Sequence, residues 1–182
     1  MNYATIKFND IANGPGVRTS LFVSGCTHGC KGCFNRIAWD FHYGQKFDET
    51  VEKEILDSLA PEYISGLTLL GGEPLEPVNQ PGILPLAEAF GARYPCKSLW
   101  IYSGFTFDVD LIPGGRAYTP VTDRILSCCH VLVDGKFIEE QRDITLRFRG
   151  STNQRLIDVP ASLAKGEVVL WEGAADFAVH TM

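Results

Sequence analysis

The sequence predicts an α/β protein with a parallel sheet, and three features of the chain support this fold class. Short apolar runs rich in β-branched and aromatic residues recur along the chain, and helical patterns lie between them. Three of the runs begin at residues 67, 98 and 130, so their starts are 31 and 32 residues apart. That interval is the length of one strand–helix unit with a right-handed crossover, which joins parallel strands.

The expected elements follow one another as strand, helix, strand, helix, strand. Asp48 can cap a helix whose apolar positions 51, 55, 56 and 59 share one face. The apolar residues between 83 and 90 indicate a second helix, and a third, shorter helix is expected at 121–126. The five expected strands are the runs 19–23, 67–70, 98–102, 130–134 and 168–171.

Length and composition predict one domain over residues 1–171 and a short C-terminal tail over 172–182, which we expect to be loosely held. The chain has 182 residues, whereas a complete eight-repeat βα barrel takes about 250, so such a barrel cannot close. The formal net charge of −6 argues against nucleic-acid binding. No apolar run reaches the ~18 residues of a membrane helix, so we expect a cytoplasmic protein that binds no membrane.

Three of the six cysteines lie within eight residues, directly after the expected strand 19–23. Cys26, Cys30 and Cys33 therefore occupy a loop at the carboxyl end of a strand, where ligand sites of βα folds gather. Thiolates bind soft metals and iron–sulfur clusters. Three cysteines can ligate three irons of a 4Fe-4S cluster and leave the fourth iron open, whereas structural zinc needs four ligands.

Zinc is the rival interpretation of this loop, with the fourth ligand supplied by His28 or by a distant cysteine. A non-catalytic iron–sulfur or zinc module, serving as an electron carrier or scaffold, is the corresponding alternative function. We interpret Cys96, Cys128 and Cys129 as core residues, because free cysteine behaves as a small buried hydrophobe. The four histidines are expected to be structural or at the surface; they are His28, His42, His130 and His180.

A second motif, Gly-Gly-Glu-Pro at residues 71–74, follows the expected strand 67–70. Two glycines let backbone carbonyls approach a ligand closely, and Glu73 can offer negative charge to an ammonium group. By itself such a motif is also typical of a plain turn. Its position at the end of the next strand favours a binding role beside the cysteines.

The cysteine spacing is similar to the three-cysteine signature of the radical S-adenosylmethionine (SAM) superfamily, and Gly-Gly-Glu-Pro resembles the element that pairs there with the SAM amino group. Further segments resemble the glycyl-radical-enzyme activases, and among them the activating enzymes of anaerobic (class III) ribonucleotide reductase. The resemblance runs from Met1 to about Trp171. The segments that carry it are NGPGVR at 13–18, CFNRIAWD at 33–40, LVDGKF at 132–137 and RGSTNQR at 149–155.

This resemblance implies a single-domain, truncated (partial) parallel βα barrel of the radical SAM type with about five strands. It implies a 4Fe-4S cluster on Cys26, Cys30 and Cys33 whose open iron binds SAM. Reductive cleavage of SAM would then yield a radical that removes hydrogen from a glycine of the partner, an anaerobic ribonucleoside-triphosphate reductase. Reduced flavodoxin or a similar protein would donate the electron, and no catalytic residue beyond the cluster and SAM is implied.

The resemblance also implies which residues contact the cofactor. Gly32, Cys33 and Phe34 would line the adenosyl side, and Gly72 and Glu73 the methionine side; Asn35 and Gly71 would also contact the cofactor. Ser103 and Gly104 match a further cofactor-contacting turn, and Asp134 and Lys136 match a pair beside the SAM carboxylate. Arg149, Asn153 and Gln154 would lie near the cofactor or the docked substrate.

The alternative within enzymes is an activase of another glycyl radical enzyme or a small-molecule radical SAM enzyme, but those resemble longer chains. No second cysteine-rich insert follows Trp39, so additional clusters are not expected. One basic cluster has no assigned role and is interpreted as either a solvated face or an anion or partner patch. It consists of Arg142, Arg147, Arg149 and Arg155.

Overall fold

The structure is a computed structural model that describes residues 1–173. Apart from its first two residues, the expected C-terminal tail at 172–182 lies outside the described residues. No helix within residues 1–173 is both long and apolar enough to cross a membrane.

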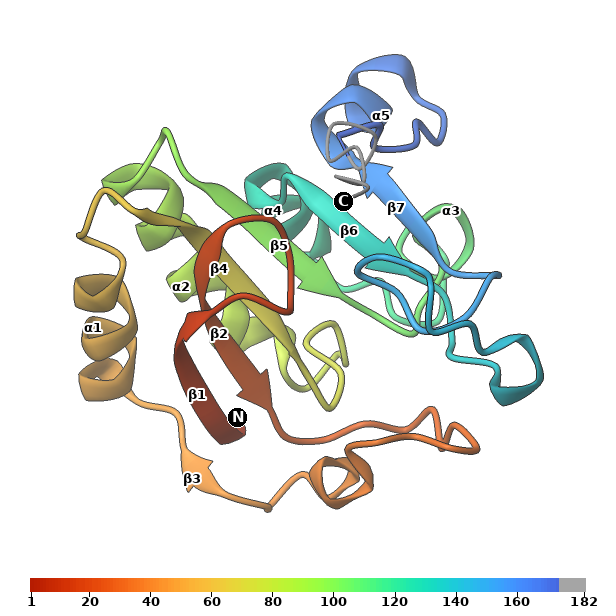
Figure 1. The fold of residues 1–182 in the computed structure, drawn as a ribbon, viewed down its shortest axis with the longest axis horizontal. Helices are drawn as coiled ribbons and strands as arrows, with labels where there is room; N and C mark the ends of the chain where they lie inside the picture. The colour runs from red at the N-terminus through yellow and green to blue at the C-terminus, as the bar shows by residue number, and fades with distance from the viewer. Residues whose placement is uncertain (174–182) are drawn as a thin grey trace, which may run out of the picture.

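A single sheet of seven strands in the order β3-β1-β2-β4-β5-β6-β7 forms the centre of the described chain (Figure 1). The four inner strands β2, β4, β5 and β6 run parallel, and β1, β3 and β7 pair antiparallel with their neighbours. The expected parallel sheet is therefore confirmed. The strands are β1 Asn2–Asp10, β2 Val17–Val23, β3 Gln45–Lys46, β4 Ile64–Gly71, β5 Ser98–Tyr102, β6 Val131–Asp134 and β7 Arg155–Asp158.

The expected strand count needs correction, whereas the open sheet agrees with a chain too short to close a full barrel. The sheet has seven strands instead of about five, and it is open, with β3 and β7 at its two edges. The expected strand 168–171 is wrong, because that segment makes only an isolated bridge between Leu170 and Ile157. β1, β3 and β7 were not predicted, and β3 has only two residues. Most of β1 is half-buried or exposed and β7 has four residues, so these two strands also lack a long apolar run.

Three helices agree with the sequence. They are α1 Glu49–Ser58, α2 Gln80–Arg93 and α4 Thr122–Cys128, and the carboxylate of Asp48 accepts hydrogen bonds from two backbone N–H groups of the first turn of α1, as expected of an N-cap. The apolar residues of α2 between 83 and 90 that suggested the helix are buried. The remaining helical elements are short and were not predicted: η1 Arg36–Trp39, α3 Phe107–Asp110, η2 Glu139–Gln141 and α5 Val159–Lys165.

The sheet has two differently packed faces. Side chains such as Leu69 and Ile101 join α1, α2 and α4 in the main core. The opposite face carries a smaller apolar cluster around Trp100. Of the three cysteines expected in the core, Cys129 is buried and Cys128 is half-buried, but Cys96 is exposed, because it lies in the connection between α2 and β5.

Candidate functional site

The sequence-predicted site residues lie at or near the carboxyl ends of the parallel strands. Most are in the loops that follow, while Gly71 and Asp134 are the last residues of their strands. The parallel strands β2, β4, β5 and β6 end at Val23, Gly71, Tyr102 and Asp134, so the segments after them emerge side by side at their carboxyl ends (Figure 1). We call residues 24–35 the cysteine loop and residues 71–74 the GGEP turn. The carboxyl ends of the strands are where α/β proteins place ligands.

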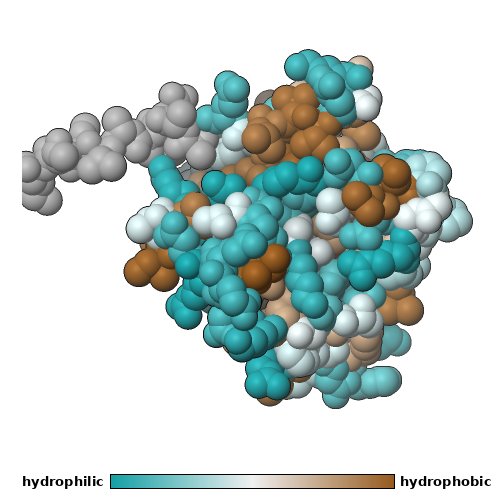
Figure 2. Space-filling view, turned by 90° about the vertical axis from the view of Figure 1, so that its right-hand side faces the viewer, coloured by the Kyte–Doolittle hydropathy of each residue, from teal (hydrophilic) through white to brown (hydrophobic). Residues whose placement is uncertain are grey.

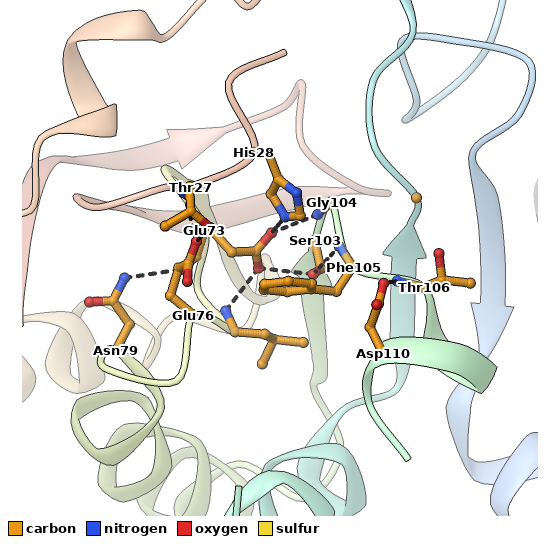
Figure 3. A network of polar contacts seen from close by, with 12 residues as sticks. Thr27, His28, Glu73, Glu76, Asn79, Ser103, Gly104, Phe105, Thr106 and Asp110 are labelled. Carbon is orange, nitrogen blue, oxygen red and sulfur yellow. Dashed lines mark hydrogen bonds and ion pairs between the residues drawn. The ribbon is translucent and has the colours of Figure 1, made fainter. Parts of the chain in front are cut away.

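The carboxylate of Glu73 is the centre of a polar network that joins three of these loops (Figure 3). Its Oε1 accepts hydrogen bonds from the Ser103 hydroxyl and the Leu75 N–H, each at 2.9 Å. Its Oε2 accepts from the Gly104 N–H at 2.6 Å and lies 3.0 Å from Nε2 of His28. Because Glu73 is 1% exposed, its negative charge is directed at protein donors inside the site.

A second buried carboxylate, Glu76, fastens the start of the cysteine loop. It accepts hydrogen bonds from the backbone N–H of Thr27 at 2.7 Å and from the Thr27 hydroxyl at 2.6 Å. The side-chain amide of Asn79 donates to the carbonyls of Ser24 and Glu73, at 3.0 and 2.9 Å. Glu76 and Asn79 were not predicted as site residues. Their signal was an acid and an amide placed three and six residues after Glu73.

The GGEP turn and the cysteine loop also touch through their backbones. The N–H groups of Gly72 and Glu73 donate to the carbonyls of Val23 and Gly25, at 2.7 and 2.8 Å. A Cβ atom on Gly72 would stand 2.6 Å from the Gly25 oxygen and 2.8 Å from the Ala38 oxygen. Glycine is therefore required here by close packing of two backbones.

The three thiols of the cysteine loop are half-buried. Burial raises the pKa of Cys26 to about 12 and also raises the pKa of Cys30, against the opposing charge of Lys136. Metal binding would have to displace these protons, since thiolates are the ligands. In residues 1–173, no three His, Cys, Asp or Glu side chains lie close enough together to hold one metal ion.

The donor set nevertheless fits a cluster. In a 4Fe-4S cluster each cysteine ligates a different iron, so its three thiolates do not converge on one point as the ligands of a single zinc ion do. Three soft donors on one loop, at the carboxyl end of a strand and against a glycine turn, provide the chemistry and the approach that such a cluster needs.

Beside the cysteine loop, Asp134 and Lys136 lie in different environments. Asp134 is 1% exposed and accepts from Nε and Nη2 of Arg155, at 3.0 and 2.6 Å, and from the Phe107 N–H at 2.8 Å. Lys136 is exposed and lies near enough to Cys30 for its charge to oppose the rise that burial causes in the pKa of that thiol. The side chains of Asn153 and Gln154 donate to the backbone carbonyls of Lys136 and Gly135.

Residues just after the third cysteine are open to solvent. Phe34 is 88% exposed, and the Asn35 side chain makes no capping hydrogen bond to η1. Gly32 has a φ of +73°, and a Cβ there would stand 2.8 Å from the carboxylate of Glu139. Lys31 pairs with Glu139 and Glu140, at 3.5 and 3.1 Å, so this part of the loop rests on the segment after β6.

The basic cluster divides between internal and surface roles. Arg155 forms ion pairs with Asp108 and Asp134, and the Arg149 guanidinium donates a hydrogen bond to the Gln154 carbonyl. Arg147, Arg149 and Arg155 line a groove of about 410 Å³ that Trp171 also borders.

The four histidines lie in different environments. The side chain of His28 is 4% exposed, whereas His42 is exposed. The His130 ring accepts a hydrogen bond from the Leu99 N–H, and His180 lies outside the described residues.

Comparison with known proteins gives concordant results. A family model described as a 4Fe-4S single cluster domain matches residues 12–157. The chain is 44% identical over 156 residues to a protein of Haemophilus influenzae, covering 85% of this chain and 96% of the relative. A relative from Escherichia coli K12 is 42% identical over the same shares, and one from Enterobacteria phage T4 is 40% identical over 86% and 93%. All three are named anaerobic ribonucleoside-triphosphate reductase-activating protein.

Proposed function

The chain belongs to the family of anaerobic ribonucleoside-triphosphate reductase-activating proteins with a 4Fe-4S single cluster domain, and from this premise we propose that it is a radical SAM activase. Its substrate would be the reductase itself, on which it generates a glycyl radical. The observation that carries the proposal is the loop with Cys26, Cys30 and Cys33 at the carboxyl end of β2, fastened to the GGEP turn of the neighbouring strand.

Cys26, Cys30 and Cys33 would hold the cluster, with the fourth iron open to SAM. When bound, the cluster and SAM supply one-electron cleavage of a sulfur–carbon bond and, through it, removal of a hydrogen atom from a glycine Cα. The protein supplies position and electrostatics for this chemistry. A thiol-based cluster site is suited to a reducing compartment such as the cytoplasm.

The chain's own residues would orient SAM from several sides. Within residues 1–173 the Gly72 carbonyl accepts no hydrogen bond, so it can accept one from the SAM ammonium. The Lys136 ammonium, exposed beside the cysteine loop, would meet the SAM carboxylate. The exposed ring of Phe34, with Gly32 and Asn35, would cover the adenosyl group.

A protein substrate needs an open site, and two features support this. Within residues 1–173 the sheet ends in the edge strands β3 and β7 instead of closing. The carboxyl ends of the parallel strands face the right-hand side of Figure 1, and Figure 2 shows that side with separate apolar patches among hydrophilic residues. Near the cysteines, Phe34 and Ile37 add exposed apolar surface. A glycine-bearing loop of the reductase could approach there, and a reduced flavodoxin or similar donor could supply the electron.

Anaerobic reconstitution with iron and sulfide tests the proposal. We expect four irons per chain and formation of 5′-deoxyadenosine from SAM with a strong reductant, followed by a glycyl radical signal in electron paramagnetic resonance when the reductase is added. A single bound zinc, or a cluster that forms no 5′-deoxyadenosine, would refute the radical SAM assignment. A radical formed on another glycyl radical enzyme but not on the reductase would refute the choice of substrate.

A further inference from the structure

We propose that His28 is a positioning residue that, through Glu73, holds the cysteine loop in place against the GGEP turn and the Ser103–Gly104 turn. In this interpretation Glu73 works from inside the protein as the junction of three loops and does not itself bind the SAM ammonium. The inference rests on the proposed function, because it concerns the loop that would carry the cluster.

His28 is built into the site. Its side chain is 4% exposed, its Nε2 lies 3.0 Å from Oε2 of Glu73, and its ring packs against Phe105 with 4.5 Å between ring centroids. The ring also occupies the space over Gly104, where a Cβ atom would lie 2.5 Å from the imidazole. A histidine so enclosed on three sides is ordered by its surroundings and can order the chain that carries it.

The hydrogen-bonding capacity of Glu73 is fully used. A carboxylate offers about four lone-pair sites. The four groups that face it are His28 Nε2 and the Gly104 N–H at Oε2, and the Ser103 hydroxyl and the Leu75 N–H at Oε1. A ligand ammonium would have to displace one of these donors, each of which is itself held inside the protein. The adjacent Gly72 carbonyl, by contrast, accepts no hydrogen bond from the described residues.

The position of His28 in the sequence makes this contact important for the thiols. His28 lies between Cys26 and Cys30, so its side chain controls the span that separates two of the three proposed ligands. The preceding residue, Thr27, is held independently by Glu76. Loss of the His28 contact should therefore loosen the loop toward Cys30 without unfolding the protein.

Two substitutions isolate the contact. His28→Leu keeps an apolar side chain against Phe105 but removes the hydrogen bond to Glu73, and in His28→Gln the side-chain amide can restore a donor to the same carboxylate. His42→Leu is the matched control, because His42 is an exposed histidine of the same chain. Cys96, which is exposed, serves as an internal reference thiol in every variant.

The first measurement uses the metal-free protein and iodoacetamide, with each cysteine followed by mass spectrometry. Alkylation of Cys30 relative to Cys96 should rise about tenfold in His28→Leu, as expected when a hydrogen bond to a charged group no longer opposes local opening. Alkylation of Cys26, which precedes the independently held Thr27, should change less. His28→Gln and His42→Leu should stay within about twofold of the wild type. Unchanged rates in His28→Leu, or equal increases in both His28 variants, would overturn the proposal.

The second measurement uses reconstituted protein and is expressed per cluster. His28→Leu should change the electron paramagnetic resonance spectrum of the reduced cluster on addition of SAM and raise KM for SAM more than it lowers kcat, and His28→Gln should restore both. Wild-type spectra and KM in His28→Leu would overturn the inference alone. If the wild type binds no cluster or does not cleave SAM, the proposed function fails, and this inference fails with it.

Discussion

Gly72→Ala should weaken both the stability of the fold and the assembly of the cluster site. Gly72 lies where the GGEP turn passes the cysteine loop, and the added methyl group would stand 2.6 Å from the Gly25 oxygen and 2.8 Å from the Ala38 oxygen. Both neighbours are backbone atoms, so no side chain can rotate away. The two loops must separate by several tenths of an ångström, which strains the hydrogen bonds that Gly72 and Glu73 donate.

The expected magnitude follows from overpacking. Inserting a methyl group into a well-packed site costs about 1–3 kcal/mol, mostly through backbone shifts. For a chain of this length each kcal/mol lowers the melting temperature by roughly 2–4 °C. We therefore expect the metal-free variant to melt at least about 2 °C below the wild type and to retain less iron after anaerobic reconstitution.

Gly91→Ala is the matched control for this substitution. Gly91 lies in α2, and a Cβ atom there would meet nothing within 4 Å. Alanine in a helix is favoured over glycine, so this variant should gain up to about 1 kcal/mol. Thermal and urea denaturation of the three proteins, with iron counted per chain, measures both effects. Wild-type stability and iron content in Gly72→Ala would refute the close packing of the two loops.

Cys30→Ala should lose cluster-dependent SAM cleavage while its far-ultraviolet circular dichroism stays native, whereas Cys96→Ala should keep the activity; equal activity in both would exclude Cys30 as a ligand. Arg155→Met should lower the free energy of unfolding by about 3 kcal/mol, since it leaves the buried Asp134 unpaired. Hydrogen bonding to Arg155 also lowers the pKa of Asp108. The difference in free energy of unfolding between the wild type and Arg155→Met should therefore narrow as the pH falls below about 3.9, because Asp108 is then protonated. A difference that stays constant down to pH 2 would contradict this. Phe34→Ala should change stability by less than about 0.5 kcal/mol because the ring is exposed, yet raise KM for SAM. An unchanged KM would remove Phe34 from the cofactor site.

The candidate site was only partly accessible from sequence. The cysteines, the GGEP turn and the Ser103–Gly104 turn are contiguous motifs after predicted strands, so their grouping at one sheet edge followed from the parallel topology. The partners that organise them are scattered along the chain. His28 was expected to be structural or at the surface, and neither Glu76 nor Arg155 was assigned its buried contact, because side-chain pairing across loops leaves no periodic signal in one sequence.

The fold shows the same division at its edges. Inner strands such as β4 and β5 are buried on both faces, so they appear as short apolar runs that sequence reasoning detects. β1 is an antiparallel strand with much of its length half-buried or exposed, and β7 is short, so both lack such a run. Residues 168–171 do form an apolar run, but they lie beside β7 and share only one bridge with it.

By itself, the sequence determined the parallel centre of the sheet, the main helices and a three-thiol loop with the chemistry of an iron–sulfur site. These features depend on local periodicity, spacing and the donor properties of residue types. Only the tertiary structure decided that antiparallel strands extend the parallel centre on both sides and that the carboxylate of Glu73 accepts hydrogen bonds from three loops. Both outcomes depend on contacts between residues distant in sequence, where burial and competition among donors determine which group pairs with which.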